Sequence, residues 1–192
     1  MRLASVVLLY KFLAFTGCSE GAKSDNATVS TKPELKPVSN LGESGTKRLM
    51  ALLNNYYAVK DALVATRAGQ ADNAANKLSA DADSLIAYIR TDSTKSTGIL
   101  PYLDTIKTSV KAMTSMMDEG CEKKRIHFER ISGAMYTMLQ KAELKNAGIY
   151  QQFCPMAFNN KGAYWLSNTE NIRNPYFGSK MLECGEVTET LN

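Results

Sequence analysis

The sequence contains few of the groups on which acid–base and nucleophilic catalysis depend. Histidine, the commonest general acid or base, occurs once, as His127. The G-x-x-x-x-G-K-[ST] pattern of a phosphate-binding loop is absent from the 192 residues. Because no catalytic residues can be assigned, the sequence indicates a protein that is not an enzyme.

An excess of charge of one sign is also missing. Lys and Arg number 23 against 19 Asp and Glu, which gives a net charge of +4, and the basic residues are scattered along the chain. A nucleic-acid-binding domain concentrates its positive charge on one face or along one helix. We therefore expect no nucleic-acid partner.

Long hydrophobic runs are lacking as well. The most apolar stretch, LASVVLLYKFLAF from Leu3, is interrupted by Lys11 and is shorter than the ~20 residues of a membrane-spanning helix. Arg2 precedes this stretch and Cys18 follows it after small residues, which is the pattern of a bacterial lipoprotein signal. We expect residues 1–17 to be removed and Cys18 to carry acyl chains that anchor the protein to a membrane of the cell envelope, on the periplasmic side or at the cell surface. The alternative is an ordinary secretory signal followed by an incidental cysteine.

The remaining chain divides into a tether and one folded domain. Residues 18–45 are rich in Ser, Lys, Gly, Asn and Pro, which is typical of a solvated linker. From residue 46 onward, apolar residues recur at spacings of three and four in four successive stretches, which predicts amphipathic helices. The stripes begin at Leu49, Ala71, Leu103 and Phe128. We expect a mainly α fold, an antiparallel four-helix bundle, in a domain that spans residues 46–192.

Glycine and proline predict where these helices begin and end. Gly69 is expected to end the first helix, and Pro101 to lie in the first turn of the third. The third apolar stripe is expected to continue into the core as far as Met117, and Gly120 to end that helix.

Residues 149–192 have a different character from the helices. The short β-capable runs IYQQF and AYWLS flank the turn-forming sequence NNKG from Asn159, in which Asn and Gly tolerate positive φ. The stretch KMLECGEVTETL from Lys180 has the composition of one more strand. We expect a C-terminal cap, partly irregular and with a small β-hairpin, at one end of the bundle.

Cysteine is scarce, and its placement allows a disulfide. With Cys18 acylated, three cysteines remain, of which Cys154 and Cys184 lie 30 residues apart in the same tail, whereas Cys121 lies in the helical region. In an oxidising compartment, Cys154 and Cys184 are plausible disulfide partners. Cys121 is then left over as a free thiol, an intermolecular disulfide partner or a ligand.

The same tail cysteines also lie beside methionines. Met156 follows Cys154 by two residues, and Met181 precedes Cys184 by three. Sulfur ligands select Cu(I) over harder ions, so the tail is equally a candidate copper site, which His127 would complete if the tail packed against the fourth helix. Methionine also fills gaps in helical cores, and a lone helical histidine is more often exposed or hydrogen-bonded than a ligand. Both the disulfide and the metal site therefore remain open.

Three stretches of the chain resemble a known family. They are YYAVKDALVA from Tyr56, HFERISGAMY from His127 and CPMAFNNKGAYWLSNTENIRNPYFGSKMLECGEV from Cys154. Over about residues 47–191 they are similar to the family called domain of unknown function 3347. Members of this family are common among exported proteins and lipoproteins of Bacteroidetes, and some are fused to periplasmic adaptors of heavy-metal (copper and silver) efflux systems.

The resemblance implies a role in copper handling. Its motif positions with metal-binding side chains are His127, Cys154, Met156, Met181 and Cys184. The first hypothesis is therefore a membrane-tethered binding protein that holds Cu(I), or a similar soft metal, for buffering or for transfer to an efflux adaptor. The second hypothesis is a structural or interaction domain, in which Cys154 and Cys184 form a permanent disulfide and the bundle docks another envelope protein.

Overall fold

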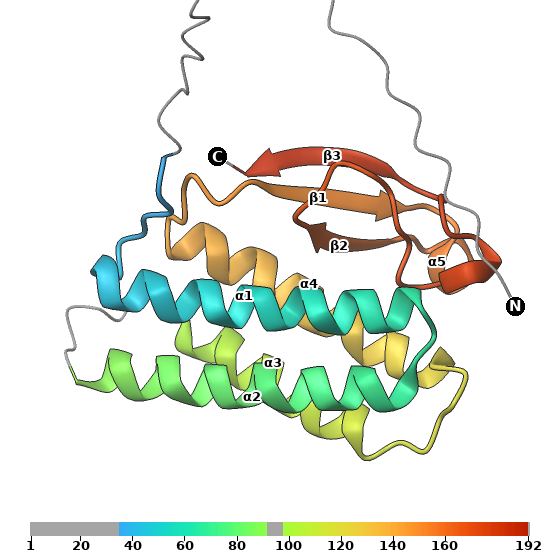
Figure 1. Cartoon of the computed structure of the whole chain (residues 1–192), viewed down its shortest axis with the longest axis horizontal. Helices are drawn as coiled ribbons and strands as arrows, with labels where there is room; N and C mark the ends of the chain where they lie inside the picture. Colours follow the sequence, from blue (N-terminus) through green and yellow to red (C-terminus); the bar gives the residue numbers. More distant parts are fainter. Residues whose placement is uncertain (1–34, 92–97, 192) are drawn as a thin grey trace, which may run out of the picture. The chain divides into compact units, whose positions relative to one another are not determined.

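The computed structural model describes residues 35–91 and 98–191 (Figure 1). Four long helices are followed by a three-stranded antiparallel sheet. The helices are α1 (Gly42–Val64), α2 (Ala68–Arg90), α3 (Leu100–Thr114) and α4 (Glu122–Lys141). This arrangement confirms the prediction of a mainly α fold with four packed helices and a small C-terminal cap.

The predicted signal peptide and the predicted lipid-bearing Cys18 lie outside the described residues, as does most of the predicted tether. The lipoprotein assignment therefore stays a prediction. Within residues 35–91 and 98–191, no helix combines the length and the hydropathy that crossing a membrane requires.

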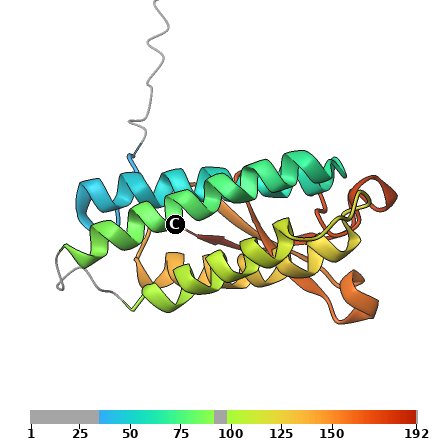
Figure 2. The same ribbon diagram turned by 90° about the horizontal axis from the view of Figure 1, so that it is seen from below.

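The helices pack as two consecutive antiparallel pairs, α1 with α2 and α3 with α4, and α2 also packs on α3 (Figures 1 and 2). The apolar stripes predicted from the sequence form the core between them. Small side chains on α2 are fully buried at Ala71, Ala75 and Ala82, which lets neighbouring helices approach closely.

The first helix boundary differs from the prediction. α1 ends at Val64, and the chain reverses at Thr66, which has a φ of 53°. Gly69 already lies in the first turn of α2, so the prediction that Gly69 ends the first helix is wrong. A left-handed threonine gives no sequence signal of its own, because glycine and asparagine are the residues that favour this conformation.

The end of the third helix also differs from the prediction. α3 ends at Thr114, and Met117, which the periodicity places in the core, is fully exposed at 102%. The cause is a buried lysine of α4. Lys124 Nζ donates to the carbonyl oxygens of Met113 at 3.1 Å and Met116 at 2.7 Å. These bonds satisfy the carbonyls at the end of α3, and the chain leaves the helical path there.

The cap is a sheet with strand order β2–β1–β3, in which β1 pairs antiparallel with both neighbours. The strands are β1 (Ile149–Cys154), β2 (Ala163–Ser167) and β3 (Glu186–Leu191). The expected hairpin is β1–β2, and the additional strand suggested by the sequence is β3. As a result, the end of β1 lies beside the start of β3.

The β1–β2 connection contains a short turn, α5 (Ala157–Asn160), with left-handed backbone. Phe158, Asn159 and Asn160 have φ values of 51°, 58° and 64°, and Gly162 has 79°. The prediction that Asn and Gly here adopt positive φ is confirmed. A Cβ on Gly162 would overlap the ring of Phe153, so this glycine is also required by packing.

Each face of the sheet contacts another part of the domain, while β3 stays largely exposed. Glu189 of β3 pairs with Gln151 of β1 and accepts a hydrogen bond of 2.7 Å from the hydroxyl of Tyr136 on α4, so this face lies on the bundle. The next residue, Gln152, points to the opposite face. Its buried side-chain amide donates to the carbonyls of Thr169 and Glu170, both at 3.0 Å. The segment from 168 to 185, which contains η2 (Gly178–Lys180), covers the second face.

A buried tyrosine joins the bundle to the cap. Tyr56 of α1 is fully buried, and its ring stacks on Phe128 of α4 with centroids 5.2 Å apart. Its hydroxyl lies 2.8 Å from Ser132 Oγ and accepts the backbone amide of Leu166 in β2 at 2.9 Å. Burial is the main reason that the pKa of Tyr56 lies well above its ordinary value.

Replacing Tyr56 with Phe is expected to lower the free energy of unfolding by about 1–3 kcal/mol, because the Leu166 amide loses its acceptor while the ring still packs. Urea unfolding followed by circular dichroism measures the change. Tyr136→Phe is the matched control, because the bonds of its hydroxyl to Glu189 and Gln140 are exposed and their loss is expected to cost about 0.5 kcal/mol or less. Equal effects of the two substitutions would contradict a special role for Tyr56.

Two adjacent basic residues anchor opposite sides of α4. Lys124, 1% exposed, donates to both carboxylate oxygens of Asp72 on α2, at 2.8 and 3.0 Å, in addition to its bonds at the end of α3. Arg125, 4% exposed, turns instead toward α1 and the cap. Its guanidinium donates to the carbonyls of Pro175 at 2.8 Å, Gly120 at 2.9 Å and Leu63 at 3.1 Å, and to Thr66 Oγ1 at 3.1 Å.

Candidate functional site

The sheet register brings two cysteines of the tail together. Cys154 is the last residue of β1, and Cys184 lies two residues before β3. Phe153 pairs with Glu186 in the antiparallel β1–β3 ladder. Cys154 and Cys184 therefore both lie just beyond this pair, at the same end of the ladder. Their Sγ atoms are 2.9 Å apart, although 30 residues separate them in the chain.

The two thiols are in contact but not bonded. The separation exceeds the ~2.05 Å of a disulfide bond. It is shorter than the ~3.8 Å expected between two thiolates that bind one metal ion tetrahedrally at ~2.3 Å. The observed separation of 2.9 Å therefore lies about midway between the distance of a disulfide and that of a tetrahedral metal site.

The two members of the pair differ in environment. Cys154 is fully buried, whereas Cys184 is partly exposed. The pKa of Cys184 is raised, first by its hydrogen bond with the Cys154 thiol and then by burial, and a hydrogen bond from the Met156 backbone opposes this shift. Cys184 is thus the member that solvent reaches, and it is a protonated thiol at neutral pH.

The two tail methionines reach the pair through their backbones. The Met156 backbone bonds the Cys184 sulfur, and the Met181 carbonyl accepts the Cys184 amide at 3.3 Å. The Met156 side chain is 47% exposed and Met181 is partly buried. The structure therefore gathers Cys154, Met156, Met181 and Cys184 in one region of the cap.

His127 does not join this group. An α-helix turns by about 100° per residue, so side chains two positions apart lie about 160° apart around the axis. Arg125 reaches the cap at Pro175, and His127, two positions further along α4, points to the opposite side of the helix. The sequence did not predict this, because it did not show which face of the fourth helix the cap covers.

The environment of His127 gives a pH dependence. Burial, followed by the charge of Arg130, lowers its pKa below the ordinary value, and its Nδ1 is buried without a hydrogen-bond partner among the described residues. Since the unfolded chain binds the proton more readily, stability is expected to fall as the pH decreases through about 6.5. Urea unfolding of the wild type and of His127→Gln, at about one pH unit above and one below this value, tests the expectation. His127→Gln should lose less stability than the wild type when the pH is lowered. Equal losses in the two proteins would contradict the expectation.

No group of three or more His, Cys, Asp or Glu side chains able to hold a metal ion occurs within the part of the chain that the structure describes. Any metal at the cap would therefore depend on the two thiols together with methionine sulfur. Such a donor set suits Cu(I) and does not suit Zn²⁺ or a harder ion.

Asn174, which the family resemblance marks as a structural motif residue, positions Cys184. Asn174 is fully buried, and its side-chain amide donates to the Cys184 carbonyl at 2.7 Å. Its Oδ1 accepts the backbone amides of Tyr176 at 2.8 Å and Phe177 at 3.2 Å. This hydrogen-bonding pattern is an Asx-turn, in which an asparagine side chain bonds the backbone two residues further on.

Cys121 is not part of the pair. It caps the N-terminus of α4 with a left-handed backbone (φ 63°), its side chain is buried, and its nearest polar contact is the Glu119 carbonyl at 3.9 Å. Burial is the main cause of its raised pKa.

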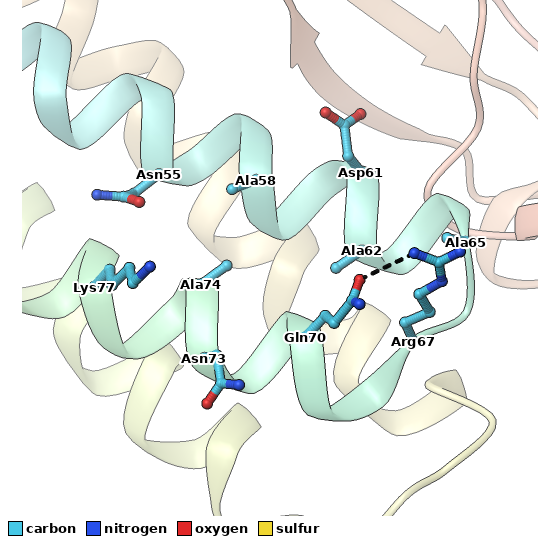
Figure 3. A pocket seen from close by; sticks show the side chains of 10 residues that line it. All are labelled: Asn55, Ala58, Asp61, Ala62, Ala65, Arg67, Gln70, Asn73, Ala74 and Lys77. Atoms are coloured by element: carbon cyan, nitrogen blue, oxygen red, sulfur yellow. Dashed lines mark hydrogen bonds between the residues drawn. The ribbon is translucent and has the colours of Figure 1, made fainter.

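A polar groove of about 440 Å³ lies between α1 and α2 (Figure 3). Its walls include Ala58, Ala62 and Ala74, and Arg67 donates to Gln70 at one end of it, at 3.4 Å. No Cys, Met, His or cap residue lines it. The groove is therefore separate from the thiol pair and offers no comparable chemistry.

The fold and the site define a class of protein, a four-helix domain whose C-terminal β-cap encloses a contacting thiol pair. The chain belongs to the family described as "Protein of unknown function (DUF3347)", whose model matches residues 52–147, half of the chain. The match begins within α1 and stops before β1, so the cap lies outside it. No curated protein and no solved structure matches the chain.

Proposed function

We propose that this chain is a non-catalytic interaction domain of the cell envelope, in which Cys154 and Cys184 close as a disulfide that secures the cap. The observation that carries the proposal is the 2.9 Å contact of the two thiols across the adjoining ends of β1 and β3. A pair this close forms a disulfide in an oxidising compartment without rearrangement of the backbone.

The test is the oxidation state of each cysteine in protein purified in air and then treated with oxidised glutathione. Peptide mapping is expected to find Cys154 linked to Cys184 and Cys121 free. In a Cys184→Ser variant, Cys154 should become free, whereas a Cys121→Ser control should keep the link. Recovery of Cys154 and Cys184 as free thiols after this treatment would overturn the proposal.

The reduced pair supports a second candidate, the binding of one Cu(I) ion. The specific observation is that the Met156 backbone bonds the Cys184 sulfur, which puts a residue with a half-exposed thioether beside two thiols. Cys154, Cys184 and Met156 would supply the sulfur ligands, and Met181, three residues before Cys184, is the further candidate. The resemblance to domains fused to heavy-metal efflux adaptors suggests such an adaptor as the partner.

Anaerobic titration with Cu(I) against a competing chelator tests this candidate. The reduced wild type should retain one ion per chain, Cys154→Ser should lose it, and Met156→Leu should bind more weakly. Met117→Leu is the matched control, because Met117 is fully exposed and lies in the α3–α4 connection rather than in the cap. A reduced wild type that retains no copper would exclude this function.

Attachment to a membrane through an acylated Cys18 completes the proposal. Its support is the sequence pattern alone, an apolar segment that leads into Cys18. Cell fractionation should find the wild type with the membranes and a Cys18→Ser variant in the soluble fraction. A variant that stayed with the membranes would contradict lipid anchoring.

A further inference from the structure

Two tyrosine hydroxyls cover the outer edge of β2. β2 pairs with β1 alone, so its second edge faces away from the sheet. On that edge, the Leu166 amide donates to the Tyr56 hydroxyl and the Tyr176 hydroxyl donates to the Tyr164 carbonyl. Backbone groups two residues apart in a strand point to the same edge, which is why one pair of tyrosines covers both. Edge strands left uncovered recruit strands from other chains.

The two tyrosines are held by different parts of the molecule. Tyr56 belongs to α1, within the bundle. Tyr176 belongs to the segment between β2 and β3, where its ring lies 5.9 Å from Trp165 and 6.0 Å from Phe128, centroid to centroid. The cover on the Leu166 amide therefore depends on the bundle alone, whereas the cover on the Tyr164 carbonyl depends on the position of the covering segment as well as on Phe128 of α4.

The side chain of Asn174 connects Tyr176 with the thiol pair. Asn174 Oδ1 accepts the Tyr176 amide at 2.8 Å, and Asn174 Nδ2 donates to the Cys184 carbonyl at 2.7 Å. Asn174 is fully buried, so both bonds are shielded from water. Holding Cys184 in place therefore also holds Tyr176, whose hydroxyl covers the Tyr164 carbonyl.

We infer that the Cys154–Cys184 pair is a redox-controlled latch for the outer edge of β2. The inference rests on the proposed disulfide. In the oxidised form, a covalent bond joins Cys184 to the end of β1, and Asn174 keeps Tyr176 on Tyr164. In the reduced form, non-covalent contacts alone hold residues 174–184, and local opening that removes Tyr176 from the edge requires less free energy.

The switch is a thiol–disulfide exchange. The thiols of Cys154 and Cys184 transfer two hydrogens and two electrons to a small-molecule disulfide, which leaves as two thiols while the protein disulfide forms. Partly exposed Cys184 is the member that such a reagent reaches first, and it forms a mixed disulfide with release of the first small-molecule thiol. Buried Cys154 then attacks the Cys184 sulfur and displaces the second small-molecule thiol.

Hydrogen exchange and tyrosine acetylation of the whole chain test the inference in the oxidised and reduced forms. The amides of Tyr176 and Phe177 are expected to exchange about tenfold or more faster after reduction with dithiothreitol. N-acetylimidazole should modify the Tyr176 hydroxyl only in the reduced form and leave Tyr56 unmodified in both. In Asn174→Ala the disulfide should form but no longer protect Tyr176, which should be acetylated in both forms. Cys121→Ser should behave as the wild type.

A measurement of the intact mass distinguishes failure of the proposed disulfide from failure of the latch. If glutathione treatment removes no hydrogens from the protein, the proposed disulfide fails and the latch fails with it. If the disulfide forms but exchange and acetylation at Tyr176 do not change, only the latch is overturned. Equal exposure of Tyr56 and Tyr176 after reduction also overturns it, because the opening would then not be confined to the covering segment.

Discussion

Replacing Arg125 with Met is expected to lower the free energy of unfolding by about 3–5 kcal/mol, the largest loss of any single substitution considered for this protein. The buried guanidinium donates to three backbone carbonyls, which belong to the α3–α4 connection, the end of α1 and the cap. Methionine fills much of the volume but supplies no donor, so the carbonyls of Pro175 and Gly120 lose the guanidinium as their donor, and the Leu63 carbonyl keeps only the Thr66 amide.

The same substitution should loosen the cap before the bundle. Trp165 is the only tryptophan of the chain and is fully buried in β2, so its fluorescence reports on the cap, whereas circular dichroism reports mainly on the helices. Urea unfolding of Arg125→Met should show the fluorescence transition at a lower midpoint than the dichroism transition. Wild-type protein should show the two together.

Two controls define the cause of this loss. Arg130→Met removes the same charge from an exposed position on α4 and should change stability by about 0.5 kcal/mol or less. Arg125→Lys keeps the charge but not the planar fork, so it should fall between the wild type and Arg125→Met. A loss below about 1 kcal/mol for Arg125→Met would show that the guanidinium does not secure the cap.

Oxidation of the Cys154–Cys184 pair is expected to raise the free energy of unfolding by about 3–4 kcal/mol, as the chain-entropy model gives for a loop of this length. The cysteines are 30 residues apart, and the loop they close contains β2 and the segment that covers the sheet. The disulfide restricts the unfolded cap far more than the folded one, in which the sulfurs already touch.

Urea unfolding by Trp165 fluorescence, with and without dithiothreitol, measures this difference. The Cys121→Ser background removes the third described thiol, and in that background the reductant should lower the midpoint. Cys184→Ser should unfold at the same urea concentration under both conditions. Identical midpoints for oxidised and reduced wild type would contradict the predicted stabilisation.

The helices were predictable because their apolar spacing is local information. Leu49, Leu53 and Tyr56 repeat at three and four residues and are all fully buried, as the periodicity requires. The boundaries failed where a distant residue decides them. α3 stops before Met117 because Lys124, which follows in the next helix, takes its terminal carbonyls, and no local pattern shows such a contact.

The candidate site was predictable in composition but not in geometry. The two tail cysteines and both methionines could be named from the sequence, since their spacing is visible there. The pairing of Phe153 with Glu186 that brings the sulfurs together is a long-range feature of the sheet register. The face of α4 on which the cap rests was equally hidden, and this face decides that His127 lies away from the sulfurs.

The pairing of the last strand with the first strand of the cap has a consequence for biosynthesis. An exported chain emerges from the membrane N-terminus first, so α1–α4, whose contacts link consecutive helices, can fold while the cap is incomplete. β1 can pair with β3 only after β3 has emerged, and Cys154 can meet Cys184 only after a further 30 residues. During that interval Cys121 and Cys154 are the only described thiols already made, so the early burial of Cys121 in the bundle protects the nascent chain from forming the wrong disulfide.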